Sequence, residues 1–212
     1  MRLLLAPHAP TDWNAQGRYQ GWTDTPLSEI GWQQAALLAR RLLKERIDAC
    51  YASDRRRAGE TAATIAEARN LTVTQDPRLR EMNFGAWEGL TYGEICQADR
   101  PSLLAWEADP MQVAPPDGET LGQVAGRVAS FLEAVAEIGA AAQDSHCRTL
   151  LVVAHRGSLR VLLCLSLRLP PSAWWQFHLT PASVSELLCF PEGAVLNFLN
   201  DTHHLREVAD AG

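Results

Sequence analysis

Two histidines in this sequence each follow a short apolar run. His8 comes after Leu3–Pro7, and His155 comes after Leu150–Ala154. Each run is too short for a helix and is typical of a buried strand. The carboxyl ends of the strands in an open α/β sheet border the crevice that binds ligands, so the sequence predicts that both histidines lie in one site.

Two charged residues follow other predicted strands. Arg57 lies near the start of a helix that is expected after the strand around Tyr51, and Glu81 lies in a loop after a further strand. Helix N-termini favour anions, and an arginine adds paired donors that match a phosphate. Taken singly, Arg57 could belong to a solvated basic run and Glu81 to the surface. Their combination with two histidines favours a functional site.

These residue types suit phosphoryl transfer through a phosphohistidine. A neutral imidazole nitrogen can attack phosphorus near neutral pH, because the ordinary pKa of histidine lies close to that pH. The second histidine and Arg57 would hold the phosphoryl oxygens, and Glu81 would protonate the leaving alcohol. Such a reaction needs no metal and no cofactor.

The four residues belong to longer blocks of sequence. The blocks lie at His8–Leu27, Ser53–Ala62, Leu79–Gly89, Val153–Arg160 and Leu199–Thr202. In order, and over nearly the whole chain, they resemble the histidine phosphatase (phosphoglycerate mutase-like) superfamily. The resemblance implies that His8 is the phosphorylated nucleophile and that Arg57 and His155 bind the phosphoryl group. It also implies that Glu81 is the general acid.

Further contacts to the phosphate or the substrate are expected from the same blocks. We assign them to Asn14, Gln20, Gly21, Arg156 and Gly157. The fold that the resemblance implies is a mixed, mainly parallel sheet flanked by helices.

One part of the pattern departs from the family. The family has Arg-His-Gly at the nucleophile, whereas this chain has Pro7-His8-Ala9. Loss of one preorganised donor to a transition-state oxyanion typically costs about 10²–10³ in rate. We hypothesise that Arg156, which stands where the family commonly has a small residue, restores the missing charge. The alternative is a surface arginine that points to solvent.

The segment Phe84–Thr91 resembles the phosphatase branch, which includes α-ribazole phosphatase and broad-specificity phosphatases, rather than the mutase branch. The favoured function is therefore hydrolysis of a phosphate monoester of a small metabolite. A degenerate family member that binds a phosphorylated ligand or a protein without turnover is the first alternative. A phosphoglycerate mutase-type phosphotransferase is the second.

The elements that position these residues can be read from the pattern of apolar and turn residues. Helices are expected at about 29–43, after a Ser28 cap, and through Ala58 to Ala66, after caps at Ser53 and Asp54. Two more are expected from Thr120 and from about Ser158. Strands are expected at 3–7, 50–52, 71–74 and 150–154, with a hairpin of 186–190 and 194–199. This alternation predicts an α/β three-layer sandwich. Residues 1–212 are expected to form a single domain, with a lid or substrate lobe at about 82–120.

Composition narrows the class of protein. A net charge of −6 argues against a nucleic-acid-binding surface. The five cysteines are scattered and have no metal-ligand spacing, which indicates reduced thiols and a cytoplasmic protein. Neither a signal peptide nor a membrane span is expected. The expected partner is a small phosphorylated substrate. The sequence leaves open whether the chain forms a homodimer.

Overall fold

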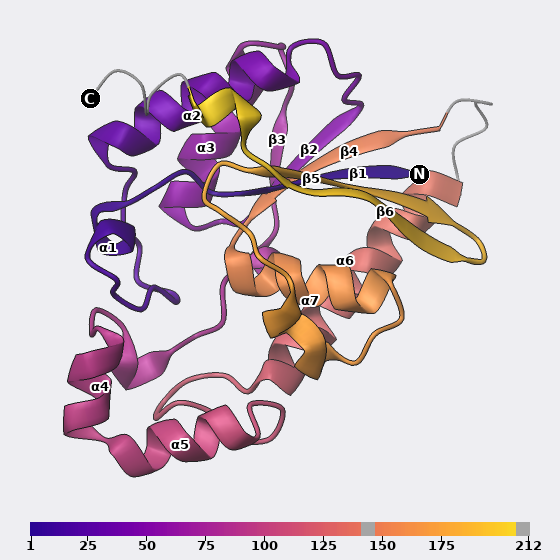
Figure 1. Ribbon diagram of the computed structural model, residues 1–212. Helices are drawn as coiled ribbons and strands as arrows, with labels where there is room; N and C mark the ends of the chain where they lie inside the picture. The colour runs from indigo at the N-terminus through magenta and orange to yellow at the C-terminus, as the bar shows by residue number, and fades with distance from the viewer. Residues whose placement is uncertain (141–146, 207–212) are drawn as a thin grey trace.

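The computed structural model describes residues 1–140 and 147–206. Its centre is a six-stranded sheet in the order β3-β2-β4-β1-β5-β6 (Figure 1). The first four strands of that order are parallel, and the last two pair antiparallel. The strands are β1 (Arg2–Pro7), β2 (Ala49–Ala52), β3 (Val73–Gln75), β4 (Thr149–Ala154), β5 (Val184–Phe190) and β6 (Gly193–Asp201). The prediction of a mixed, mainly parallel sheet is confirmed.

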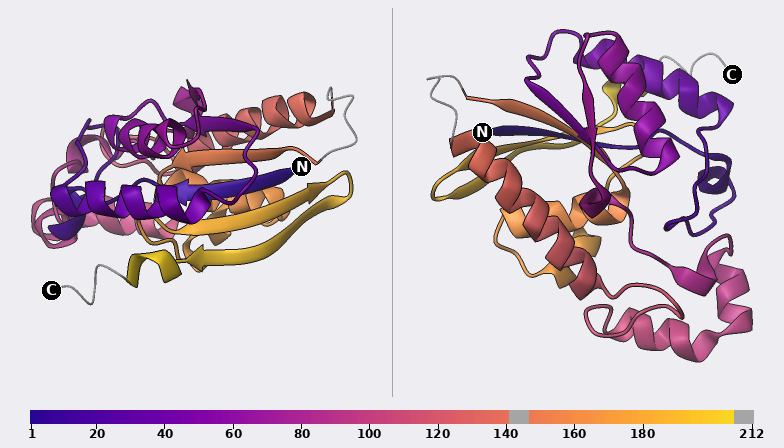
Figure 2. Two further views of the ribbon diagram at one scale, coloured as in Figure 1. Left: turned by 90° about the horizontal axis from the view of Figure 1, so that it is seen from above. Right: turned by 180° about the vertical axis from the view of Figure 1, so that it is seen from behind.

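Helices cover both faces of the sheet. Figure 1 shows α2 (Glu29–Leu42) and α3 (Arg56–Glu67) above the sheet, and α6 (Leu121–Ala140) and α7 (Arg156–Ser166) below it. The view from behind in Figure 2 shows the same two layers. Each face has its own apolar core: Leu4 of β1 packs with α2 and α3, whereas Leu3 packs with α6 and α7. This alternation of side chains along a strand produces the predicted three-layer sandwich.

A proline ends the central strand that carries the nucleophile candidate. The even-numbered residues Arg2 and His8 donate their backbone N–H groups to carbonyls on the β4 side. A backbone N–H at position 7, which is odd-numbered, would point to the other side, towards β5. The pairing of β1 with β5 ends at Leu5, before this position. Proline has no N–H to donate, but this position requires none, so it costs no ladder hydrogen bond.

Two of the predicted helix starts are wrong by a few residues. Ser28 does cap α2, accepting from the Gly31 N–H at 3.1 Å. However, α3 begins at Arg56, and the N-cap residue Arg55 gives it no side-chain cap. The Ser53 hydroxyl accepts from the Arg55 N–H at 3.3 Å and lies 2.9 Å from Nε2 of His155. The Arg56 N–H donates instead to Asp24 at 2.6 Å. Helix α7 begins at Arg156, two residues before the predicted start, with His155 at the N-cap position. At α3, a side chain from a distant segment therefore replaces the expected local cap.

The segment after Glu81 forms a separate group of short helices. It contains the 3₁₀ turn η2 (Gly85–Trp87) and helices α4 (Tyr92–Ala98) and α5 (Arg100–Ala108), which lie away from the sheet at the lower left of Figure 1. Buried Trp87 and Trp106 pack edge to face with ring centroids 5.7 Å apart, within the core cluster that contains α6 and α7. The remaining short elements are α1 (Asp12–Ala15), η1 (Pro77–Leu79), η3 (Pro171–Gln176) and η4 (His203–Leu205).

Two helical glycines offer a test of this packing. A Cβ at Gly31 of α2 would lie 2.0 Å from the carbonyl oxygen of Pro10, whereas a Cβ at Gly126 of α6 would have no atom within 4 Å. We expect Gly31→Ala to lower the free energy of unfolding by about 1–3 kcal/mol through overpacking. Gly126→Ala should raise it by about 0.5–1 kcal/mol. Urea unfolding of both variants checks this, and equal stability of the two would contradict the described packing.

Candidate active site

His8 lies directly after β1 and is 6% exposed. Its Nδ1 is 2.8 Å from the carbonyl oxygen of Ala9. A carbonyl can only accept, so Nδ1 carries the proton and Nε2 keeps its lone pair. Burial, and after it the charge of Arg57, lowers the pKa of His8 to about 3. At neutral pH the imidazole is therefore uncharged, with Nε2 in the form of a nucleophile.

The guanidinium of Arg57 is fully buried beside this imidazole. Its Nη1 donates to the carbonyl of Thr23 at 2.9 Å and its Nη2 to the carbonyl of Gly21 at 2.8 Å. Its Nε donates to His8 Nε2 at 3.3 Å. Burial lowers the pKa of Arg57 to about 10, so the group stays charged at neutral pH. Its hydrogen-bond partners are neutral, whereas the carboxylates of Glu81, Asp24 and Glu88 lie within electrostatic reach and act to raise its pKa.

His155 meets His8 as the two strand patterns predicted. The ring centroids lie 5.2 Å apart at an interplanar angle of 62°. His155 Nε2 lies 2.9 Å from the hydroxyl oxygen of Ser53, and Nδ1 is buried without a hydrogen-bond partner among the described residues. Burial and the Arg57 charge lower the pKa of His155 well below its ordinary value. A buried nitrogen of this kind can bond to an oxygen that enters the site.

Glu81 faces the same site from the loop after η1 and is 8% exposed. One carboxylate oxygen accepts from the Met82 N–H at 2.9 Å, and the other accepts from the Gly157 N–H at 2.9 Å. A Cβ at Gly157 would lie 2.1 Å from Glu81 Oε1. Only glycine at this position lets the carboxylate reach the N-terminus of α7.

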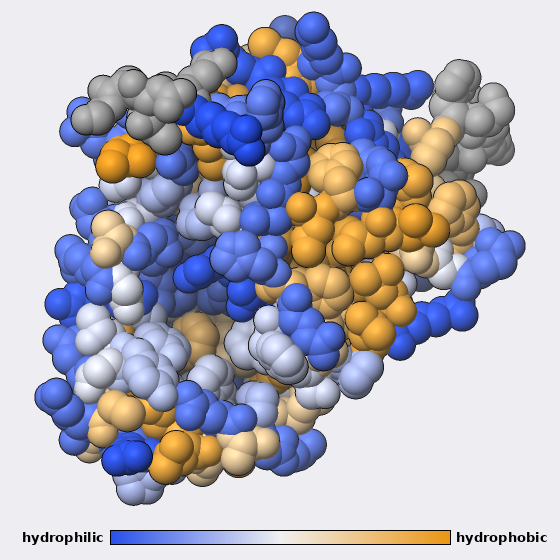
Figure 3. Space-filling view, viewed as in Figure 1, coloured by the Kyte–Doolittle hydropathy of each residue, from blue (hydrophilic) through white to orange (hydrophobic). Residues whose placement is uncertain are grey.

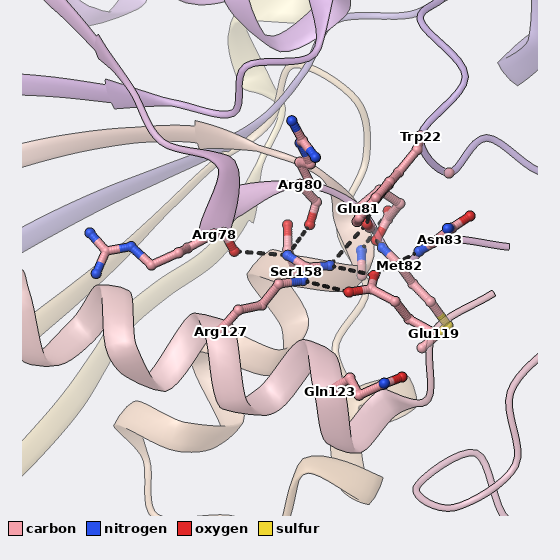
Figure 4. Close-up of polar contacts among 12 residues, drawn as sticks. Trp22, Arg78, Arg80, Glu81, Met82, Asn83, Glu119, Gln123, Arg127 and Ser158 are labelled. Carbon is pink, nitrogen blue, oxygen red and sulfur yellow. Dashed lines mark hydrogen bonds and ion pairs between the residues drawn. The ribbon is translucent and has the colours of Figure 1, made fainter. Parts of the chain in front are cut away.

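The loop that carries Glu81 is held by Arg127 of α6, as Figure 4 shows. Arg127 Nη1 donates to the carbonyls of Arg78 at 2.8 Å and Arg80 at 2.5 Å, and Nη2 donates to the carbonyl of Glu81 at 2.9 Å. The ion pair with Glu119, at 3.1 Å, fixes the guanidinium from the other side. The sequence analysis missed Arg127, because contacts to backbone carbonyls far along the chain leave no local pattern.

A cavity of about 350 Å³ opens beside His8 and Glu81. Figure 3 shows a hollow with hydrophilic walls left of the centre of the molecule. Four of the predicted contact residues line this cavity: Asn14, Gln20, Arg156 and Gly157. Several residues of the wall were not predicted as contacts, among them Arg160 of α7 and Trp174 of η3.

The predicted contact residue Gly21 lies outside the cavity lining. Its carbonyl accepts from Arg57, and a Cβ at this position would lie 2.0 Å from Glu88 Oε1. Its place in the structure is therefore beside Arg57, in the loop that surrounds the guanidinium.

The two amides in the cavity wall present their donor groups. Asn14 Oδ1 accepts from the Thr11 N–H at 2.9 Å. Gln20 Oε1 accepts from the hydroxyls of Thr11 at 2.8 Å and Thr25 at 2.9 Å. Because both amide oxygens are used, each NH₂ group is left as a donor. Both amides are thus suited to an anionic ligand.

The arrangement defines a class of protein. Four side chains converge where the parallel strands end: a neutral histidine, a second histidine, a carboxyl group and a buried arginine that hydrogen-bonds to no carboxylate. This set can transfer a phosphoryl group. The sequence model of the histidine phosphatase superfamily (branch 1) matches residues 3–202. The chain belongs to this superfamily.

Three relatives are similar to the chain over most of their length. The chain is 36% identical to phosphoserine phosphatase 1 of Hydrogenobacter thermophilus, over 98% of this chain and 95% of that protein. It is 40% identical to glucosyl-3-phosphoglycerate phosphatase of Mycobacterium tuberculosis, over 82% of this chain and 78% of that protein. The crystal structure of α-ribazole phosphatase from Shigella flexneri superimposes with a TM-score of 0.86 at 31% identity, covering 95% of this chain and 96% of that one.

These relatives share a reaction but differ in the alcohol that is released. All three are named as phosphatases, in a superfamily that acts without a metal. The chain is accordingly a metal-independent hydrolase of phosphate monoesters, which confirms the predicted activity. Because the relatives are named for three different substrates, the identity of this chain's own substrate must come from its cavity.

The buried imidazole of His8 predicts how stability depends on pH. Its pKa is about 3 in the folded protein, and its ordinary value is 6.5. Between these values the unfolded chain binds the proton and the folded one does not, so stability falls as pH falls from about 6.5 towards 3. His8 alone contributes up to about 1.4 kcal/mol per pH unit in this window. Denaturant unfolding from pH 7 to pH 4 should show a shallower slope for His8→Asn than for wild type, and equal slopes would contradict a buried neutral His8.

Proposed function

We propose that the protein hydrolyses its substrate in two steps through a phosphohistidine on His8. In the first step His8 Nε2 forms a bond to phosphorus, the bond from phosphorus to the ester oxygen breaks, and Glu81 gives that oxygen its proton. In the second step Glu81 takes a proton from water, the oxygen of which attacks phosphorus. The bond to Nε2 then breaks, and inorganic phosphate leaves.

The tautomer of His8 is the observation that carries this proposal. The Ala9 carbonyl fixes the proton on Nδ1, so the Nε2 lone pair faces the guanidinium of Arg57, 3.3 Å away. A phosphoryl group brought to Nε2 would have its oxygens beside Arg57 and near the imidazole of His155, whose ring centroid lies 5.2 Å from that of His8. Donors placed where charge develops act strongly in a site of this burial.

Arg156 supplies the charge that Pro7 cannot. Its exposed side chain lines the cavity together with His8, and its positive charge contributes to the lowered pKa of His8. The latter effect requires the guanidinium to lie within electrostatic reach of the imidazole. It supports the hypothesis that Arg156 binds the phosphoryl group over the alternative of an arginine that points away.

Residues 82–120 act as a lid lobe within one domain, residues 1–212. Phe84 and Trp106 of this lobe line the cavity. Glu88 accepts the backbone N–H groups of Trp22 and Thr23, both at 2.7 Å, in the loop that surrounds Arg57. These contacts support a lobe that both walls the substrate site and holds its buried arginine.

The partner is a small phosphorylated metabolite, in keeping with a cavity of about 350 Å³. The net charge of −6 argues against nucleic acid as a partner. Within the described ranges no helix is long and apolar enough to span a membrane. The thiols of Cys50 and Cys164 are buried and free, which fits a reducing, cytoplasmic setting.

A homodimer would use the hairpin of β5 and β6. β6 is an edge strand, and the hairpin exposes Phe190 and Val195. Figure 3 shows hydrophobic residues gathered over this side of the molecule. An unpaired edge with apolar side chains favours pairing with another chain.

The role of Arg156 can be tested by phosphate release from a panel of phosphate monoesters. Arg156→Ala should lower kcat/KM by about 10²–10³, the effect of losing one donor to the transition state, while His8→Ala should abolish release. Arg168→Ala, a change at an exposed arginine beyond the C-terminal end of α7, is the matched control. Full activity of Arg156→Ala would refute its role. Release that survives His8→Ala would refute the nucleophile, and no release by wild type would favour a degenerate binding protein.

The role of Glu81 predicts a dependence on the leaving group. Glu81→Gln should lower turnover of an alkyl phosphate such as glycerol 3-phosphate by about 10²–10⁴, because the alkoxide needs a proton. Turnover of p-nitrophenyl phosphate should fall far less, since its leaving group departs as a stable anion. The measurement is the rate of phosphate release from each of the two substrates, compared between Glu81→Gln and wild type. An equal loss on both substrates would exclude Glu81 as the general acid.

A further inference from the structure

Helix α7 presents two arginines to the cavity. Arg156 and Arg160 both line it, and residues four positions apart lie on one face of a helix. Neither side chain has a hydrogen bond or an ion pair with another described residue. In contrast Arg18, also in the cavity wall, donates to the Gly89 carbonyl at 2.6 Å and pairs with Glu94 at 3.1 Å. The charges of α7 are thus the ones left for a ligand.

Arg160 lies in the more enclosed of the two positions. Its side chain is half-buried, and its Nε is fully buried without a hydrogen-bond partner in the described part of the chain. Burial and the nearby charge of Arg156 lower its pKa. A buried donor without a partner costs free energy, and an anion that accepts from it recovers that cost.

The balance of charge limits what this anion can be. Glu81 also lines the cavity, and as the proton donor of the proposed first step it enters that step uncharged. Arg57 and Arg156 together then carry two positive charges, which match a phosphoryl dianion at His8. Arg160 then leaves one further positive charge, which matches a monoanion such as a carboxylate rather than a second phosphate dianion. A guanidinium binds a carboxylate through two parallel hydrogen bonds.

We propose that Arg160 binds a carboxylate on the leaving group, so that the substrate is a phosphorylated hydroxy acid or hydroxy amino acid. This inference rests on the proposed function, because it takes the scissile phosphoryl group to lie at His8. Side chains one helical turn apart are separated by about 5–6 Å at their Cβ atoms. The carboxylate would therefore lie only a few bonds from the ester oxygen, between α7 and the aromatic wall of Trp106 and Trp174.

Two matched pairs of substrates isolate the carboxylate. O-phospho-L-serine differs from O-phosphoethanolamine by that group, and 3-phosphoglycerate differs from glycerol 3-phosphate by a carboxylate in place of an alcohol. The wild type should prefer the acid of each pair by at least about tenfold in kcat/KM, the effect of one hydrogen-bonded charge. Arg160→Gln should bring both ratios close to one, and Arg160→Lys should keep part of the preference. Arg168→Gln should leave the ratios of wild type.

Binding to the inactive His8→Ala protein separates this inference from the proposed function. Calorimetric titration should give tighter binding of O-phospho-L-serine than of O-phosphoethanolamine, and adding Arg160→Gln should remove the difference. The difference in affinity is expected even if the wild type turns over no substrate. Three results would overturn the carboxylate assignment. The first is equal affinity of His8→Ala for the two ligands, and the second is a kcat/KM ratio in Arg160→Gln equal to that of wild type. The third is a higher kcat/KM of wild type for fructose 1,6-bisphosphate than for the two acids. Thermal unfolding of Arg160→Gln, expected near that of wild type, excludes a general loss of fold.

Discussion

The buried guanidinium of Arg57 is the constraint on which the site depends. Each of its nitrogens has a fixed acceptor: the carbonyls of Gly21 and Thr23 and the Nε2 atom of His8. Burying a charge is costly unless it is hydrogen-bonded and balanced by other charges. The hydrogen bonds of Arg57 go to neutral acceptors, and the carboxylates of Glu81, Asp24 and Glu88 act on it from further away. The same hydrogen bonds orient His8 and shape the loop around Gly21. In the proposed mechanism, one side chain therefore supplies affinity for the phosphoryl anion and also orients the nucleophile.

The sheet brings the parts of this site together. β1 and β4 are adjacent and parallel, and Pro7 pairs with Ala154 at their ends, so the next residues, His8 and His155, come face to face. β2 lies on the other side of β4 and leads into α3, which begins beside this pair and carries Arg57. The Glu81 loop is then secured to α6 and to the start of α7. Strand order and register therefore bring four segments that are far apart in sequence together at the carboxyl ends of the parallel strands.

Much of this could be predicted from sequence, because apolar runs and turn residues report strands directly. The two strand-histidine patterns placed His8 and His155 in one site, and the Ser28 cap was also predicted correctly. The contacts that hold the site could not be predicted. Ser53 was taken for a helix cap although its hydroxyl faces His155, and Arg127 reaches carbonyls more than forty residues away in sequence. Side-chain contacts of that range have no periodicity, and the exposed or buried state of Arg160 likewise depends on packing from distant segments.

The central claim is that His8 Nε2 forms a covalent bond to phosphorus during turnover. The most direct measurement is a rapid quench in alkali, which preserves phosphohistidine, during turnover of p-nitrophenyl phosphate, followed by mass spectrometry of the peptides. The account predicts a transient phosphoryl group on His8, accumulating before steady state and absent from His8→Ala. Turnover at full rate without a phosphorylated His8, or with the phosphoryl group on another residue, would contradict it.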